Sequence, residues 1–578
     1  MKHFNVFIVA ITTCFAISCN SNADNTTKAE AADAADIIYY GGDIVTMEGD
    51  NAAYAEAIAV KNGKIAFVGA KADAEKMKGD STMMNDLQGK TLLPGFIDSH
   101  GHFINSLSMS LQANCSVPPV GNAADVNGIV ASLKEFQAKK NIPRGEMIIG
   151  YGYDDTQMPG GRLLNRDDLD KDFPDNPVMV FHISLHGAVM NSLALKKFGF
   201  SKKTVTPAGG VIVRKPDTNE PYGLIMETAF IPVFPNLPKP MPEQQLQQLK
   251  NGQRMYAEAG VTTAQEGATR KADFDIIVNG AKNNALFIDV ITYPFILDSK
   301  AILQEHPFTE FGKYQNHFKI GGVKIIEDGL PEVKTAFFTT PYLTGGTAGE
   351  KNWKGEPIFP QDSINAWMKW LYKNKAQLII HGNGDAAIDV LLKGHEYACK
   401  ALNQPLDNDR RTTVIHSQFV RMDQLEKYKA YNIIPSLYTE HTFFFGDAHI
   451  KNRGLEQASF ISPLNTTDKM GLKPTNHTDF NVFPIDQMMV IWTAMNRTTR
   501  SGILLGAEER VTAYQALKAI TINAAHQYFE EASKGSLKQG KLADLVILDH
   551  NPLKTDIARI RDIKVAETIK EGKTIYKK

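Results

Sequence analysis

The chain has 578 residues but only four cysteines and almost no net charge, and these shortages exclude several protein classes. Four cysteines are too few for a disulfide scaffold in a chain of this length. The 63 basic and 64 acidic residues nearly cancel, so no nucleic acid or other polyanion is expected as a partner. Cys115 and Cys399 either pair or remain buried thiols, and the sequence leaves both alternatives open.

The chain also lacks the short motifs of several enzyme classes. No Gly-x-Ser-x-Gly elbow, P-loop or paired Cys-x-x-Cys occurs, which removes support for a serine hydrolase, a P-loop nucleotidase or a zinc ribbon. Beyond the first 19 residues, no apolar run is long enough to span a bilayer. The composition, with 43% hydrophobic and 22% charged residues, is that of a globular protein.

Residues 1–19 have the pattern of an export signal. A short basic segment precedes an apolar run over residues 4–17, which is too short to span a bilayer. The segment ends at Cys19 and resembles a bacterial lipoprotein signal, although Ala16 stands where leucine is usual. The resemblance implies export and anchoring through lipidated Cys19 on the periplasmic or cell-surface side of a bacterial membrane, with residues 20–35 as a flexible tether. A plain secretory signal with an incidental cysteine is the alternative.

Alternating strand-like and helical patterns predict an α/β protein. Short apolar runs lie at residues 177–181, 261–264, 287–292, 320–326, 377–381 and 413–416. Helical patterns lie between them, for example at residues 363–374 and 386–402. Repeated β-then-α order favours parallel strands, and at this length a (β/α)₈ TIM-like barrel. We assign residues 94–505 to the barrel, with an inserted subdomain at about 114–250, because that stretch is too long for one loop.

Both ends of the chain carry β-strand patterns. Residues 36–93 contain several strand-like runs, and Asn62-Gly63 between two of them is a strong hairpin signal. Residues 506–578 combine a last barrel helix with further strand-like runs. Neither end has enough strands for its own sandwich. We therefore predict that both ends pair into one small composite β-sandwich domain.

The strongest chemical signal is the segment 92–102, Leu-Leu-Pro-Gly-Phe-Ile-Asp-Ser-His-Gly-His. On an extended strand, residues i and i+2 point to the same side. We therefore expect His100 and His102 to lie on a strand and to converge on one divalent metal ion. Two histidines on a strand are often incidental, but their place directly after this apolar run makes the signal more specific.

Residues 94–102 resemble the first barrel strand of the amidohydrolase superfamily. Residues 535–546, Gly-Ser-Leu-Lys-Gln-Gly-Lys-Leu-Ala-Asp-Leu-Val, resemble its C-terminal return to the β-domain. Within the superfamily the chain is similar to the amidohydrolase-3 (YtcJ-like) family. Further motifs follow in the family's order, at residues 151–155, 186–195, 260–263 and 521–525. The resemblance implies a hydrolase that cleaves a non-peptide, amide-type carbon–nitrogen bond of a small molecule with a metal-activated water.

The resemblance also implies a ligand set for one or two divalent ions, zinc by preference. The implied ligands are His100, His102, Lys324, His381, His416 and Asp479. His100, His102 and Asp479 would hold one ion, and His381 and His416 the other. Lys324 would join them after carboxylation by CO₂, because an anionic carbamate can bridge two cations. Without the resemblance, Lys324 is better explained as a lysine paired with Glu327 or Asp328.

Catalytic roles follow from the same resemblance. Asp479 is the implied proton acceptor and donor, in a His-Thr-Asp sequence where the family usually has Gly-Ser-Asp. His441 or His186 is implied to polarise the scissile carbonyl, or else is an ordinary surface histidine. His477 lies two residues before Asp479 and is a candidate substrate contact.

Two other functions stay open. The same site could hydrolyse an ester, a lactone or a phosphoester, since an activated water can attack any of these centres. A lipid-anchored binding protein without turnover is the second alternative, although a complete set of candidate ligands argues against it. The oligomeric state cannot be inferred from the sequence.

Overall fold

The computed structural model describes residues 34–578 apart from 156–157, 184–186, 208–209, 238–241 and 347–349. The predicted signal, tether and lipidated Cys19 lie outside the described residues, and so does His186. Within the described part of the chain, no helix combines the length and the apolar character needed to cross a membrane.

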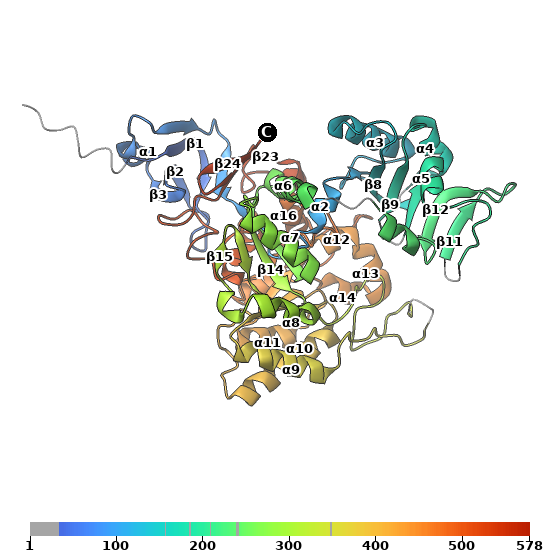
Figure 1. The fold of residues 1–578 in the computed structure, drawn as a ribbon. Coiled ribbons are helices and arrows are strands. Elements are labelled where there is room, and N and C mark those ends of the chain that lie inside the picture. Colours follow the sequence, from blue (N-terminus) through green and yellow to red (C-terminus); the bar gives the residue numbers. More distant parts are fainter. Residues whose placement is uncertain (1–33, 156–157, 184–186, 208–209, 238–241, 347–349) are drawn as a thin grey trace, which may run out of the picture.

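One eight-stranded sheet takes strands from both ends of the chain (Figure 1). Its order is β24-β23-β22-β5-β1-β2-β3, with β4 also paired to β1. The strands are β1 (Ile37–Val45), β2 (Tyr54–Lys61), β3 (Lys64–Gly69), β4 (Met83–Asp86), β5 (Thr91–Pro94), β22 (Leu545–Leu548), β23 (Val565–Lys570) and β24 (Lys573–Lys577). Asn62 and Gly63 have φ values of 50° and 75°, the left-handed pair that a two-residue hairpin turn requires. The hairpin predicted between β2 and β3 is thereby confirmed.

The central strands run parallel in two five-stranded sheets, β15-β16-β14-β13-β6 and β17-β18-β19-β20-β21. The first contains β6 (Phe96–Ile97), β13 (Val261–Thr269), β14 (Asp289–Pro294), β15 (Tyr314–Gln315, which pairs antiparallel) and β16 (Phe318–Ile320). The second contains β17 (Gly322–Ile326), β18 (Gln377–Gly382), β19 (Thr413–His416), β20 (Ile434–Leu437) and β21 (Thr475–Asn476). Strand order and register fit a TIM-barrel-type α/β fold.

Two sets of contacts connect these sheets. A parallel bridge joins Phe295, which follows β14, to Lys324 of β17. On the other side, the Asp479 amide donates to the His100 carbonyl at 3.1 Å, and the His102 amide donates to the Phe480 carbonyl at 2.6 Å. The segments that follow β6 and β21 therefore lie against each other, although they are far apart in the sequence.

Helices precede or follow the parallel strands. They include α6 (Pro242–Glu258), α7 (Lys271–Lys282), α8 (Ile296–Glu305), α9 (Gln361–Lys373), α10 (Asp385–Leu402) and α11 (Met422–Tyr431). The apolar faces of α9 and α10, with Ile364, Met368, Ile388 and Leu391, pack in one core with Val323 of β17 and its neighbours. Burial of apolar surface in such a core stabilises the fold by about 25 cal/mol for each Å² removed from water. The helices expected at residues 363–374 and 386–402 are present within two residues of those bounds.

A six-stranded sheet, in the order β11-β12-β10-β9-β8-β7, forms a separate part of the molecule (Figure 1). Its strands are β7 (Ala113–Asn114), β8 (Ile148–Tyr153), β9 (Val178–His182), β10 (Gly187–Met190), β11 (Gly210–Arg214) and β12 (Pro221–Glu227). The accompanying helices are α3 (Val126–Lys140), α4 (Arg166–Asp172) and α5 (Ser192–Lys197). Cys115, in this part, and Cys399, in α10, are both buried free thiols, so they do not pair.

Candidate metal centre

His100 and His102 lie after the first parallel strand, not on it. Strand β6 ends at Ile97, so the prediction of a His-x-His on an extended strand is wrong. The Asp98 carboxylate accepts hydrogen bonds from the Thr478 hydroxyl at 2.6 Å and the Thr478 amide at 3.2 Å. These bonds turn the chain toward the segment after β21. The two imidazoles still converge, with ring centroids 5.4 Å apart and planes at 70°.

The ring of His100 is held in one orientation by β13. His100 Nδ1 lies 2.5 Å from Gln265 Oε1, and Gln265 Nε2 donates to the Tyr528 hydroxyl at 2.8 Å. Because Gln265 Oε1 accepts a hydrogen bond, it favours the tautomer of His100 in which Nδ1 carries the proton. Nε2 is then unprotonated and its lone pair can bind a metal ion. Gly267 packs against the same ring, because a Cβ at that position would lie 2.4 Å from His100 Cε1.

His381 and His416 lie near the ends of adjacent strands, β18 and β19, as predicted. His416 Nε2 is 3.1 Å from His381 Nδ1, and the ring centroids are 4.5 Å apart. The His416 ring is also 5.6 Å from the His100 ring. The structure therefore brings this pair next to the His100 and His102 pair.

Asp479 and Lys324 lie between the two histidine pairs. Asp479 Oδ1 is 3.5 Å from His100 Nε2 and 3.6 Å from His102 Nε2, while Oδ2 is 3.9 Å from His416 Nε2. Lys324 of β17 donates to His100 Nε2 at 3.2 Å. All six predicted ligands thus meet at one place, on the side where the parallel strands end.

Burial controls the protonation of this group. It lowers the pKa of His102 to about 4 and that of His381 to about 3, with the Lys324 charge acting in the same direction. Burial also lowers the pKa values of His100 and His416 well below the usual range for histidine. Four neutral imidazoles result at pH 7, which is the form that binds metal ions. Burial also lowers the pKa of Lys324 and raises that of Asp479.

The donor set fits a divalent metal ion. Asp479 Oδ1 and His416 Nδ1 are buried and have no hydrogen-bond partner among the described residues. A buried carboxylate oxygen left without a partner is costly, and a cation removes that cost. Imidazole nitrogens combined with carboxylate oxygens are the usual ligands of zinc and similar ions.

The sequence offered little sign of two further residues at the centre, His477 and Tyr438. The His477 ring lies 5.2 Å from the His100 ring and 5.1 Å from the His416 ring. Neither of its nitrogens has a hydrogen-bond partner among the described residues. The Tyr438 ring lies beside the His477 ring, with centroids 4.7 Å apart and planes tilted by 30°. The spacing of His477 from Asp479 was the only available signal, and nothing distinguished Tyr438.

His441 does not contact the six ligands directly. It lies in α12 (Glu440–Phe444), 4.5 Å from the Tyr438 ring, and its Nδ1 is 3.1 Å from His449 Nε2. The Phe445 ring packs against His441 with centroids 5.0 Å apart, and Phe443 packs against Trp492 at 5.3 Å.

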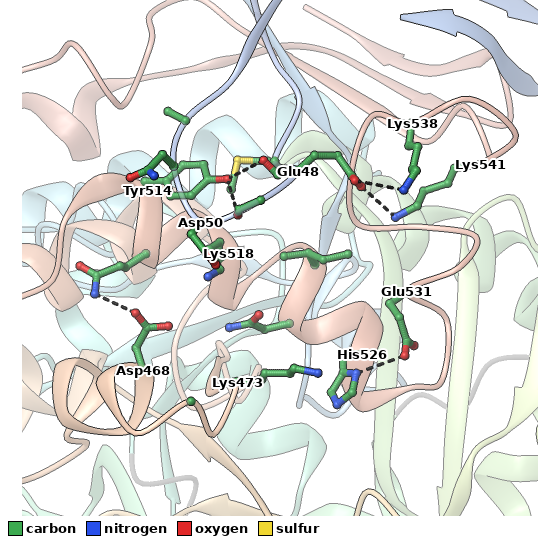
Figure 2. A pocket seen from close by; sticks show the side chains of 18 of the residues that line it. Glu48, Asp50, Asp468, Lys473, Tyr514, Lys518, His526, Glu531, Lys538 and Lys541 are labelled. Atoms are coloured by element: carbon green, nitrogen blue, oxygen red, sulfur yellow. Dashed lines mark hydrogen bonds and ion pairs between the residues drawn. The ribbon is translucent and has the colours of Figure 1, made fainter. Parts of the chain in front are cut away.

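A separate cavity of about 1120 Å³ lies between the loop after β1 and the helices α17 (Ala513–Ala519) and α18 (Ile522–Gln527), and Figure 2 shows its lining. Glu48 faces Lys538 and Lys541 at 3.4 and 3.5 Å, and His526 faces Glu531 at 3.2 Å. Its lining contains none of the six predicted ligands. The predicted chemistry therefore lies elsewhere.

Comparisons with known proteins identify the family of this chain. Residues 84–576 match a model described as the amidohydrolase family. The putative amidohydrolase YtcJ of Bacillus subtilis is 25% identical over 94% of this chain and 99% of its own length. N-substituted formamide deformylase of Arthrobacter pascens is 24% identical over 94% of this chain and 98% of its own.

A solved structure supports the fold. An uncharacterised metal-dependent hydrolase from Pyrococcus horikoshii is similar with a TM-score of 0.67 at 21% identity, covering 90% of this chain and 99% of that one. The family match spans most of the chain and includes the segments that carry all six converging side chains. This protein therefore belongs to the amidohydrolase family.

Proposed function

We propose that this protein is a metal-dependent amidohydrolase that cleaves a non-peptide, amide-type carbon–nitrogen bond of a small molecule. The observation that carries the proposal is a cluster of four imidazoles at Asp479: His100, His102 and His416 face its carboxylate, and His381 lies against His416. The bond class is supported by the name of one relative, an N-substituted formamide deformylase.

In this proposal, His100, His102 and Asp479 hold one divalent ion, and His381 and His416 hold a second. The grouping follows the distances: Asp479 Oδ1 faces the first pair, and Oδ2 faces His416. The carboxylate can therefore contribute to both positions. Zinc is the preferred ion, because imidazole and carboxylate donors suit it.

Lys324 would join the two positions as a carbamate. Its neutral amine adds to CO₂, forming a nitrogen–carbon bond and releasing one proton, which leaves an anionic carboxylate on the side chain. Burial favours the neutral amine that this step needs. A carbamate oxygen is an acceptor for cations, whereas the ammonium form would repel them.

A divalent ion bound here supplies an activated water and polarises the scissile carbonyl. Asp479 accepts the proton of the attacking water and delivers it to the leaving nitrogen. Gln265 keeps the His100 ring in the orientation that presents Nε2. The Tyr438 ring lies beside His441, and His441 is given no part in the reaction. His186 lies outside the described residues, and its proposed role remains polarisation of the scissile carbonyl.

The proposal extends to the architecture and location. We propose that the two five-stranded sheets together form the (β/α)₈ barrel of residues 94–505, with an insertion at about 114–250. Residues 36–93 and 506–578 would form the composite β-domain. Residues 1–19 would direct export, and lipidated Cys19 would anchor the protein to a bacterial membrane on its periplasmic or cell-surface side.

The test combines metal analysis with a substrate panel. Purified protein is assayed for bound zinc and for hydrolysis of N-substituted formamides and other amides, before and after removal of metal by a chelator. Esters, lactones and phosphoesters in the same panel test the alternative bond classes. We expect amide hydrolysis that is lost with the metal and restored by zinc. A metal-free protein with full activity would overturn the proposal.

His100→Ala separates a hydrolase from a binding protein. The variant removes one proposed ligand, so a hydrolase loses metal and turnover together. A protein that only binds an organic molecule keeps its affinity for that molecule. His395→Ala is the matched control, because His395 is buried in α10 and bonds to Tyr372, away from the centre.

A further inference from the structure

Three clusters of histidine and acidic side chains in the described part of the chain bring their donor atoms within 4.8 Å of one another. They are His100, His416 and Asp479; Asp289, His317 and Glu571; and Glu332, His441 and His449. The first belongs to the centre described above. In the second, Asp289 is already paired with Lys534 and Lys570 at 2.5 Å each, so its charge is compensated. For the third cluster, no ion pair with a basic side chain is present among the described residues.

The third cluster joins a loop to two short helices. Glu332 lies in the segment between β17 and α9, His441 in α12, and His449 in α13 (Gly446–Arg453). The rings of His441 and His449 are parallel within 7°, with centroids 5.3 Å apart. His441 Nδ1 and His449 Nε2 are 3.1 Å apart, a spacing that suits two nitrogens on one tetrahedral ion with bonds of about 2.0–2.1 Å.

Polar atoms in this cluster lack partners. Glu332 Oε2 and His449 Nδ1 are buried and make no hydrogen bond within the described residues. Glu332 has no ion pair there either. Burial raises the pKa of Glu332 to about 7, its own backbone amide acts in the opposite direction, and the Asp479 charge adds to the effect of burial. Leaving a carboxylate buried without a partner costs free energy, and two buried neutral imidazoles cannot compensate it. A bound cation would satisfy the free oxygen of Glu332 and the two facing nitrogens, His441 Nδ1 and His449 Nε2, although not His449 Nδ1.

We propose that Glu332, His441 and His449 bind a further divalent cation of the zinc class, separate from the six-ligand centre. Two imidazole nitrogens and one carboxylate oxygen are a known zinc ligand set, which leaves a fourth position open. The Tyr438 ring separates this site from the main centre, with centroids 4.5 Å from His441 and 4.7 Å from His477. The inference stands independently of the proposed reaction, and it gives His441 a ligand role in place of carbonyl polarisation.

The test counts ions per chain. The full protein and the variants Glu332→Gln and His449→Gln are stripped with a chelator, equilibrated with excess zinc, freed of unbound metal and analysed by mass spectrometry of the elements. His395→Gln serves as the control, since it alters a buried histidine outside both sites. We expect the wild type and the control to hold one zinc ion more per chain than the other two variants.

A second comparison separates this site from the main centre. In a chain carrying His100→Ala and His102→Ala, which disrupts the main centre, adding Glu332→Gln should still lower the zinc content by one ion per chain. Circular dichroism would show whether each variant folds. Glu332→Gln is isosteric and lies on a loop, so it tests the site even if His449→Gln does not fold. Equal zinc content in folded Glu332→Gln protein and wild type would overturn the inference. That result would mean that His441 and His449 are simply hydrogen-bonded to each other.

Discussion

Two of the six converging side chains are carried by backbone in the left-handed region. His416 has a φ of 73° and Asp479 a φ of 47°, and Ser417 follows His416 at 42°. Such positions cost roughly 1–3 kcal/mol each for non-glycine residues, although Asp, Asn and His tolerate them better than most. The hydrogen bond from the Asp479 amide to the His100 carbonyl helps to hold this conformation. Local backbone strain is therefore concentrated at residues whose side-chain orientation sets the positions of the donor atoms.

Asp479→Asn should separate the chemistry from the fold. Asparagine tolerates the same backbone conformation, so we expect a thermal midpoint close to that of the wild type. Loss of the proton acceptor should lower kcat roughly 10²–10⁴-fold, measured on whichever amide the panel identifies. Asp479→Ala should lose activity and also stability, because alanine does not favour this φ. A fully active Asp479→Asn enzyme would remove the catalytic role assigned to this carboxylate.

Gly267→Ala should disturb the centre without touching a ligand. The new Cβ would lie 2.4 Å from His100 Cε1, so the ring or strand β13 must shift, at a cost of about 1–3 kcal/mol. We expect zinc affinity to fall roughly 10–100-fold in a competition titration, as when a group supporting a ligand is altered. Gly382→Ala is the control, because its Cβ would approach nothing closer than 3.5 Å although it is next to His381. Equal affinity in both variants would show that the Gly267 contact does not position His100.

At the level of elements, the strands near the site could be predicted because they are short apolar runs followed by polar residues. His381 and His416 were located in this way, and β18 and β19 place them as expected. The path of residues 98–102 could not be predicted, since it depends on Thr478, which is hundreds of residues away. His449 and Tyr438 were missed for the same reason: nothing in their local sequence marks them, and only the packing of α12, α13 and β20 brings them together. Lys324 required the family resemblance, because a lysine within an apolar strand has no local signature.

A buried ionic network links β14 to the C-terminal segment and β23. Asp289 accepts from Lys534 and Lys570 at 2.5 Å, and Lys570 also donates to Asp544 at 2.7 Å. Burial opposes the charged form of Asp289, but the two lysines outweigh it and hold its pKa well below the ordinary range. These contacts attach the eight-stranded sheet to the parallel strands.

Asp289→Asn should destabilise the protein by about 3–5 kcal/mol at pH 7, because two lysines are left buried with less compensation. The stabilising effect of the native carboxylate is present above its unfolded pKa of about 3.9 and is lost as the pH falls through the lower folded pKa. Urea denaturation at pH 7 and pH 3 should therefore show a smaller difference between variant and wild type at the lower pH. Asp275→Asn is the control, since that aspartate forms an exposed pair with Lys271. Equal effects of the two substitutions at pH 7 would show that the buried network is not a stabilising connection.

On the scale of the whole molecule, the metal centre lies where the two parallel sheets meet. Its donors come from β17, β18 and β19 and from the segments after β6 and β21. Ions bound there would stabilise the fold by about 4 kcal/mol when free ion is a thousandfold above its dissociation constant. We expect chelated protein to melt at a lower temperature in calorimetry and zinc to restore the midpoint, whereas magnesium should restore it poorly. Unchanged melting after complete metal removal would show that the centre does not hold the sheets together.

The pairing of β5 with both β1 and β22 has a consequence for the newly made chain. Strand β22 is synthesised more than four hundred residues after β5, as the printed sequence shows. Until then, β5 has an open edge, and the N-terminal strands cannot complete their sheet during translation. Completion of this sheet must therefore wait until β22 has been synthesised, and a product truncated before β22 would expose an unpaired β edge to other chains and to quality-control proteases.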